Sequence, residues 1–185
     1  MKIIVVRHGE SRHNVGLDED NDSALTKNGR KQVEYLGKKL KKQKISKIYT
    51  SNLLRAKQTA EIISKIIKIP VEDNLEELNE YKGKQLRSRL KMLFNIRVKR
   101  LKKFLKNISK DREKDKTLLI IAHGITNRII IGYLLQIPLK KQLLFFRQHN
   151  TGVNILTWDN DFKNWKLEHM NDISHLPKNL EKILK

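Results

Sequence analysis

The chain has 185 residues, 38% of them apolar, which is enough for the core of one sizeable domain, so we expect a single domain over residues 1–185. The absence of cysteine excludes a disulfide framework and thiolate chemistry, and no apolar stretch is long enough to span a bilayer. We therefore expect a cytoplasmic protein without a membrane partner. The formal charge of +20 favours anionic partners, although lysine is abundant throughout the chain.

The first half of the chain alternates strands and helices. Residues 2–6, KIIVV, predict a fully buried strand, and residues 46–50, SKIYT, predict a shorter one. Thr26 is a candidate N-cap for the helix between them, whose apolar residues fall on one face. Those residues are Val33, Leu36 and Leu40. Residues 52–67 continue with similar spacing, so the order is strand, helix, strand, helix.

The longest amphipathic pattern covers residues 85–110. Its apolar residues recur at intervals of three, four or eight: Leu86, Leu90, Leu93, Leu101, Leu105 and Ile108. The opposite face is crowded with lysine and arginine. The Lys-rich segment 110–116 that follows is typical of a solvated loop.

The second half of the chain predicts another buried strand and a hairpin. Residues 117–122, TLLIIA, have the pattern of a strand that is covered on both faces. A helix is expected from residue 125 to about Gln136, and Pro138 stops it. Residues 152–158 and 163–169 alternate in a way that favours a late hairpin.

Two histidines follow the two most apolar strands. The first strand ends in RHG and the strand at 117–122 ends in AHG. Because the carboxyl ends of parallel strands meet at one edge of an open sheet, we expect His8 and His123 to lie together there. Gly9 and Gly124 would let backbone N–H groups approach a ligand closely.

Two arginines are expected at the same edge. Arg55 falls in the first turn of the helix after the strand at 46–50, and Arg7 immediately precedes His8. Guanidinium groups bind phosphate oxygens in a bidentate way, and helix N-termini favour negative charge. This set predicts a site for a compact dianion such as a phosphoryl group, in which a histidine can act as donor or nucleophile.

These residues belong to four ordered blocks that resemble the histidine phosphatase superfamily, which includes cofactor-dependent phosphoglycerate mutases and many small phosphatases. The blocks are RHGES followed by Asn14, then DSALTKNGRKQ, SNLLRAKQTAEII and IIAHG; NDISHL near the end resembles a tail of family phosphatases. The resemblance covers most of the chain. It implies a three-layer α/β/α sandwich with a mainly parallel sheet.

The resemblance also implies roles for individual residues. His8 would be the nucleophile that becomes phosphohistidine, and Arg7, Arg55 and His123 would bind the phosphoryl group and stabilise its charge. Asn14 would support the same oxygens. No metal and no cofactor is implied.

Family members also use a carboxylic acid that protonates the leaving oxygen, usually in an L-x-E stretch downstream of the RA-x-QTA block. The sequence LEEL at 75–78 puts Glu77 in this position. The next family motif, G-x-W-E-G, is replaced by NEYKG at 79–83. Glu77 is therefore the first choice, and Glu76 and Glu80 remain alternatives.

The favoured function is hydrolysis of a small phosphorylated metabolite. A cofactor-dependent phosphoglycerate mutase is the closest alternative, but such mutases usually have a longer chain with E-R-H-Y-G after the acid. Another alternative is a catalytically silent module that holds a phosphorylated ligand or a polyanion in the same site. The sequence leaves the substrate and the oligomeric state open.

The resemblance locates substrate specificity within residues 77–116, which we expect to cover the substrate. Arg87, Arg89 and Arg97 on the basic face of that segment are candidates for selecting an acidic substrate, beside the simpler interpretation of a solvated helix face. Nucleic-acid binding is less favoured, because no aromatic stacking platform accompanies the basic residues.

Overall fold

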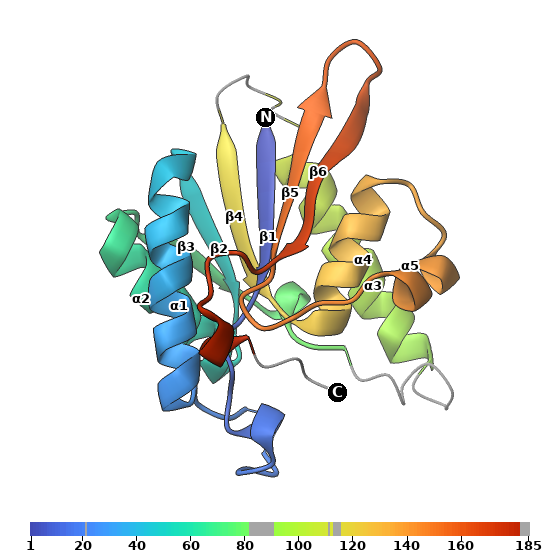
Figure 1. The fold of residues 1–185 in the computed structure, drawn as a ribbon. Helices are drawn as coiled ribbons and strands as arrows, with labels where there is room; N and C mark the ends of the chain where they lie inside the picture. Colours follow the sequence, from blue (N-terminus) through green and yellow to red (C-terminus); the bar gives the residue numbers. More distant parts are fainter. Residues whose placement is uncertain (21, 82–90, 111, 113–115, 182–185) are drawn as a thin grey trace.

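The computed structural model describes residues 1–20, 22–81, 91–110, 112 and 116–181. Its centre is a six-stranded sheet in the order β3-β2-β4-β1-β5-β6 (Figure 1). The strands are β1 (Lys2–Arg7), β2 (Lys47–Ser51), β3 (Val71–Leu75), β4 (Thr117–Ala122), β5 (Val153–Asp159) and β6 (Asn164–Asp172). β1 to β4 run parallel, and β5 and β6 form an antiparallel hairpin beside β1. The predicted α/β fold with a mainly parallel sheet is confirmed.

Helices cover both faces of this sheet, which gives three layers (Figure 1). α1 (Lys27–Leu40) and α2 (Leu54–Ile67) pack together on one face. The other face carries α3 (Lys91–Ile108), α4 (Gly124–Leu134) and α5 (Leu139–Phe145). None of the helices in the described part of the chain is both long and apolar enough to cross a bilayer.

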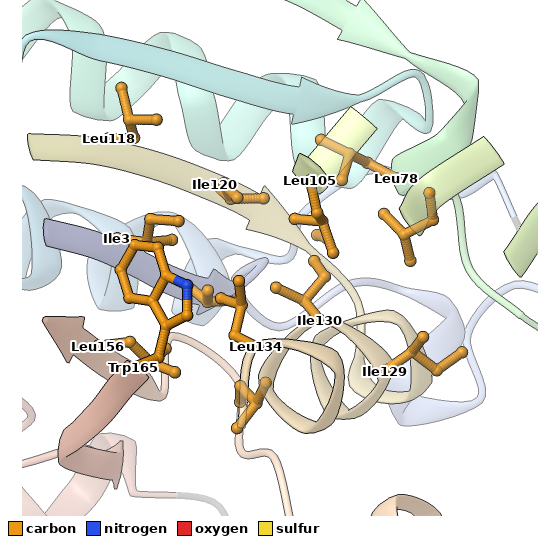
Figure 2. Close-up of a cluster of buried hydrophobic side chains, with 14 of the residues drawn as sticks. Ile3, Leu78, Leu105, Leu118, Ile120, Ile129, Ile130, Leu134, Leu156 and Trp165 are labelled. Atoms are coloured by element: carbon orange, nitrogen blue, oxygen red, sulfur yellow. The ribbon is translucent and has the colours of Figure 1, made fainter. Parts of the chain in front are cut away.

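Strand β1 shows why the central strands are continuously apolar. Ile4 and Val6 belong to the core under α1 and α2, whereas Ile3 and Val5 belong to the core on the opposite face. Figure 2 shows that second core, where Ile3 lies among side chains of β4, β5, α3 and α4. Because both faces are covered, each of these four residues contributes buried apolar area, worth about 1.5–3 kcal/mol per aliphatic side chain.

The connection from β1 to α1 is held by residues of the second sequence block, DSALTKNGRKQ. Thr26 caps α1 by accepting a hydrogen bond from the Gly29 amide at 2.9 Å. The Gln32 side chain accepts from the Glu10 amide, also at 2.9 Å. Gly29 lies so close to Glu10 that a Cβ would stand 2.0 Å from the Glu10 carbonyl oxygen. The start of α1 therefore fixes the loop that follows β1.

The structure differs from the sequence predictions in three elements. β3 was not predicted, and α4 ends at Leu134 instead of Gln136. The helix stops early because Gln136 takes a left-handed conformation with φ 57°, and Pro138 then precedes a further helix, α5, as its N-cap. Of the helix expected over 85–110, the described part is α3, and the expectations for residues 82–90 lie outside the described residues.

Candidate active site

The parallel pairing of β1 and β4 brings the two histidines together. The register places Arg7 opposite Ala122, so His8 and His123 are the next residues on adjacent strands. Their ring centroids lie 5.0 Å apart, and both side chains are buried. The backbone amide of His8 donates to the Ala122 carbonyl at 3.1 Å, which continues the ladder to the edge of the sheet.

The hydrogen bonds of His8 define which ring nitrogen is reactive. Nδ1 lies 2.7 Å from the Gly9 carbonyl oxygen, which can only accept, so Nδ1 carries the proton. Nε2 accepts a hydrogen bond of 3.0 Å from Nε of Arg55. Burial, and then the charges of Arg55 and nearby groups, hold the pKa of His8 well below its usual value. At neutral pH the ring is uncharged, with its lone pair on Nε2.

The tautomer of His123 is fixed by a second chain of hydrogen bonds. Its Nε2 lies 2.8 Å from Ser51 Oγ, and Ser51 Oγ donates to Asn79 Oδ1 at 2.7 Å. Because the hydroxyl has one proton, which goes to Asn79, Nε2 of His123 must be the donor in its own contact. Burial and the charges of Arg55 and Arg7 hold the pKa of His123 well below its usual value.

The charges of both predicted arginines act on the two histidines. Arg7 donates from a terminal guanidinium nitrogen to the Gln148 carbonyl at 2.7 Å, and burial lowers its pKa to about 10, so it stays charged at neutral pH. Arg55 is buried in the first turn of α2. Thr59, one turn later, donates to the Arg55 carbonyl at 2.7 Å and accepts from the Gly9 amide at 3.2 Å. This threonine ties α2 to the loop after β1.

Asn14 and Gly124 also lie at this edge. Asn14 Oδ1 accepts a hydrogen bond from the Asn150 amide group at 3.1 Å, and the same group donates to the His8 carbonyl at 3.0 Å. This orientation makes Nδ2 of Asn14 the atom that can donate to a phosphoryl oxygen. Gly124 begins α4, and a Cβ at this position would lie 3.8 Å from Cζ of Arg7.

Glu80 is a carboxylate whose charge acts on both Arg7 and Arg55. Its Oε1 accepts from the Ile125 amide in the first turn of α4 at 3.1 Å and from the Tyr81 amide at 3.2 Å. Burial raises the pKa of Glu80, although the charges of Arg7 and Arg55 and both amides oppose the shift. The group therefore holds its proton at a higher pH than an exposed glutamate.

Glu80 and Glu77, the first choice from the sequence, have different surroundings. Glu77 belongs to the short 3₁₀ helix Glu76–Leu78, and its charge acts on Tyr81. Burial lowers the pKa values of Arg7 and Arg55, and the charge of Glu80 opposes this shift at both. Two stretches of the sequence match L-x-E: LEE, which ends at Glu77, and LNE, which ends three residues later at Glu80.

Arg97 supports the glutamate segment. Its guanidinium donates to the carbonyls of Asn79 at 3.2 Å and Glu80 at 3.3 Å, and it lies 4.5 Å from the ring centroid of Tyr81. This side chain holds the backbone that carries Glu80. Arg87 and Arg89, the other two candidates, lie outside the described residues.

The sequence prediction missed Ser51 and Asn79. Ser51 is the last residue of β2, so it lies at the same edge as His8 and His123, and that position was the available signal. Asn79 had no comparable signal. Within the described residues, no group of three or more histidine or carboxylate side chains is gathered in the way that a metal ion needs.

Comparisons with known proteins show the family to which the chain belongs. The family model described as histidine phosphatase superfamily (branch 1) matches residues 3–92 and 94–173. A probable phosphoglycerate mutase, GpmB of Photorhabdus laumondii, is 27% identical over an alignment of 207 positions, which covers 95% of each chain. The mitochondrial serine/threonine-protein phosphatase Pgam5 of Drosophila yakuba is 30% identical, and the match covers 84% of this chain but 57% of that protein.

Solved structures share the fold over nearly the whole chain. The alpha-ribazole phosphatase of Shigella flexneri superimposes with a TM-score of 0.76 at 20% identity, covering 94% of this chain and 97% of that one. Phosphoserine phosphatase of Entamoeba histolytica, in complex with 3-phosphoglyceric acid, also has a TM-score of 0.76, at 23% identity, covering 95% and 99%.

Proposed function

Because the chain belongs to the histidine phosphatase superfamily, we propose that it hydrolyses small phosphomonoesters through a phosphohistidine at His8, without a metal ion. The observation that carries this proposal is the arrangement around one imidazole. The Gly9 carbonyl fixes the proton of His8 on Nδ1, and the Arg55 guanidinium lies against Nε2. A neutral ring with a directed lone pair beside a fixed cation suits attack on a phosphorus atom.

In the first step, Nε2 of His8 attacks phosphorus and the bond from phosphorus to the leaving oxygen breaks. Arg7, Arg55 and His123 stabilise the negative charge on the equatorial oxygens, with Asn14 as a further donor. His123 serves as a donor in the protonated form, which a bound dianion favours by opposing the effect of the arginines.

Glu80 supplies the proton that the leaving oxygen needs. Its raised pKa supports this role, because a general acid works best when its pKa is near the working pH. The alcohol then departs, and Glu80 is left as a carboxylate. In the second step this carboxylate takes a proton from water as the water oxygen attacks phosphorus, the bond to His8 breaks, and inorganic phosphate forms with Glu80 protonated again.

Hydrolysis of p-nitrophenyl phosphate in the presence of EDTA tests this proposal. The wild type should release phosphate, and His8→Ala should not. His169→Ala is the matched control, because His169 is an exposed histidine on β6. Loss of wild-type activity in EDTA that returns with added metal ions would contradict the metal-independent mechanism.

Phosphoglycerate mutase activity is the second candidate, because the match to GpmB covers 95% of both chains. Supplying 3-phosphoglycerate with 2,3-bisphosphoglycerate separates the two. A mutase interconverts 3-phosphoglycerate and 2-phosphoglycerate faster than it releases phosphate, whereas a phosphatase shows the reverse. If neither reaction occurs but phosphorylated ligands bind, the silent binding module is the better account.

A further inference from the structure

Among the described residues, the side-chain cations whose charges act on His8 and His123 are arginines, although the chain as a whole is rich in lysine. The sequence has 29 lysines and 11 arginines. The charges that lower the pKa values of His8 and His123 nevertheless come from arginines and from the other histidine. The general lysine excess therefore does not explain this local charge. Arginine differs from lysine in its planar, bidentate binding of oxyanions.

Two arginines at the site lie outside the group that grips the phosphoryl oxygens. Arg128 is three residues after Ile125 in α4, so the two residues are neighbours on one face of the helix. The Ile125 amide donates to Glu80 at 3.1 Å, and side chains on a helix lean toward its N-terminus. Arg128 therefore lies on the helix face of this contact. Burial lowers the pKa of Arg128, and the charge of Glu80 opposes the shift.

Arg147 lies in the segment before β5, next to Gln148. The next residue, Gln148, accepts from Arg7 through its carbonyl oxygen at 2.7 Å and contacts Asn127 of α4 through its side chain at 3.4 Å. This puts the segment between Arg7 and α4. The charge of Arg147 also lowers the pKa of Arg128, as expected for two cations on one side of the site.

The role of Glu80 defines which part of the substrate these arginines face. In the proposed mechanism Glu80 protonates the leaving oxygen, and the leaving oxygen stands opposite His8 in an in-line displacement. Groups beside Glu80 therefore face the alcohol part of the substrate. Arg128 lies on the helix face of the Ile125–Glu80 contact, and Arg147 precedes Gln148 in the neighbouring segment, while Arg7 and Arg55 act on the phosphoryl group next to His8.

We propose that Arg128 and Arg147 form a second anion site and that the preferred substrate carries a carboxylate or a second phosphate close to its phosphate ester. This inference rests on the proposed function, because Glu80 as the acid defines the side that the alcohol occupies. It narrows the substrate class from phosphomonoesters in general to small metabolites with two anionic groups.

Matched substrates test the proposal directly. 3-Phosphoglycerate and glycerol 3-phosphate differ by a carboxylate against a hydroxymethyl group, and fructose 1,6-bisphosphate and fructose 6-phosphate differ by a second phosphate. A charge-assisted contact should raise kcat/KM for the doubly anionic member of the preferred pair by about 10- to 100-fold in the wild type. The pair with the larger ratio identifies which anion the site takes.

Variants assign the effect to the two arginines. Arg128→Gln and Arg147→Gln should bring the ratio for the preferred pair close to one, with the singly anionic substrate changed by less than about threefold, and Arg128→Lys should give an intermediate ratio. Lys141→Gln, at an exposed position of α5, is the control and should leave the ratio unchanged. A wild-type ratio near one for both pairs, or a ratio unaffected by both glutamine variants, would overturn the proposal.

Binding measurements keep this test separate from the proposed hydrolysis. Calorimetric titration of His8→Ala with 3-phosphoglycerate and glycerol 3-phosphate, and with the two fructose phosphates, compares the same pairs without turnover. Tighter binding of a doubly anionic member that is lost in the double variant His8→Ala, Arg128→Gln supports the second site even if the wild type hydrolyses nothing. Equal affinities within both pairs contradict it even if p-nitrophenyl phosphate is hydrolysed.

Discussion

Arg55 and His8 form a direct hydrogen bond in which Nε of the arginine donates to Nε2 of the histidine over 3.0 Å. The contact joins the first turn of α2 to the end of β1, and Thr59 fixes the same two segments through the Gly9 amide. A cation held at the nucleophilic nitrogen keeps the imidazole neutral. The Arg55 guanidinium also lies next to the nitrogen that the phosphoryl group must approach, so it can bind the phosphoryl oxygens.

Replacing Arg55 by lysine should therefore lower kcat for p-nitrophenyl phosphate by about 100-fold or more, as removal of one preorganised donor does in other enzymes. Lysine keeps the charge but cannot bind two phosphoryl oxygens through a planar fork. Arg30→Lys, on the exposed face of α1, is the control. Activity of Arg55→Lys within a few-fold of the wild type would refute a bidentate role.

The choice between Glu80 and Glu77 can be made with two matched variants. Glu80→Gln should lower the rate on an alkyl phosphate, which needs a protonated leaving group, by about 100-fold or more. The effect on p-nitrophenyl phosphate should be smaller, because p-nitrophenolate leaves without a proton. Glu77→Gln should change both rates little, and the opposite result would return the acid role to Glu77.

Asn79 is expected to act as a positioning residue for His123. In Asn79→Leu the Ser51 hydroxyl loses its acceptor and can donate to His123, so both tautomers should appear in ¹⁵N spectra of the imidazole. The wild type and Asn79→Asp should show the Nε2–H form. We expect kcat to fall about fivefold to tenfold in Asn79→Leu, in line with about 1 kcal/mol for a neutral hydrogen bond. A lower kcat with an unchanged tautomer would assign Asn79 a merely structural role.

For Gly29→Ala, the sign of the change in the free energy of unfolding tests the prediction. In an exposed helix the change from glycine to alanine stabilises by about 1 kcal/mol. Here the added Cβ would stand 2.0 Å from the Glu10 carbonyl oxygen, so the backbone after β1 must shift. We expect a loss of about 1–3 kcal/mol in the free energy of unfolding, measured by urea denaturation. Stabilisation by the alanine would show that the contact is not rigid.

His175 should make the protein less stable in mild acid. Its Nε2 contacts Thr151 Oγ1 at 3.1 Å, and that hydroxyl donates to the Asn150 carbonyl, so Nε2 carries the proton and buried Nδ1 would have to accept a second one. Burial lowers the pKa of His175 to about 4.

The sign of the pH effect follows from this pKa. As the pH falls from the ordinary histidine value of 6.5 to about 4, the unfolded chain binds a proton at His175 that the folded chain does not. The free energy of unfolding therefore decreases across this window. His175→Gln should flatten the melting temperature between pH 7 and pH 5 relative to His169→Gln, an exposed control, and parallel curves for the two variants would contradict the argument.

The central elements were predictable because their physical signals are strong. The apolar run before Arg7 has nearly no interpretation other than a strand covered on both faces, and Thr26 followed by one-sided apolar residues defines α1. β3 was missed because its sequence, VEDNL, is polar and its pairing with β2 at the sheet edge is set by the fold instead of by its own pattern.

The site was partly predictable for the same reason. His8, His123 and Arg55 each follow a strand, so topology alone brought them to one edge. Glu80 could not be separated from Glu77, since both fit L-x-E and the choice depends on how the chain turns after the 3₁₀ helix. Arg128 and Arg147 come from α4 and from the segment before β5, and only the folded arrangement of Gln148 against Arg7 relates them.

Trapping the covalent intermediate tests the central claim most directly. The protein would be mixed with a ³²P-labelled phosphomonoester, quenched in alkali within the first turnover, digested, and its labelled peptide sequenced, because phosphohistidine survives alkali and is lost in acid. The account predicts label on the peptide that contains His8, and none in His8→Ala. Rapid phosphate release by the wild type with no trapped label, or equal release by His8→Ala, would contradict it.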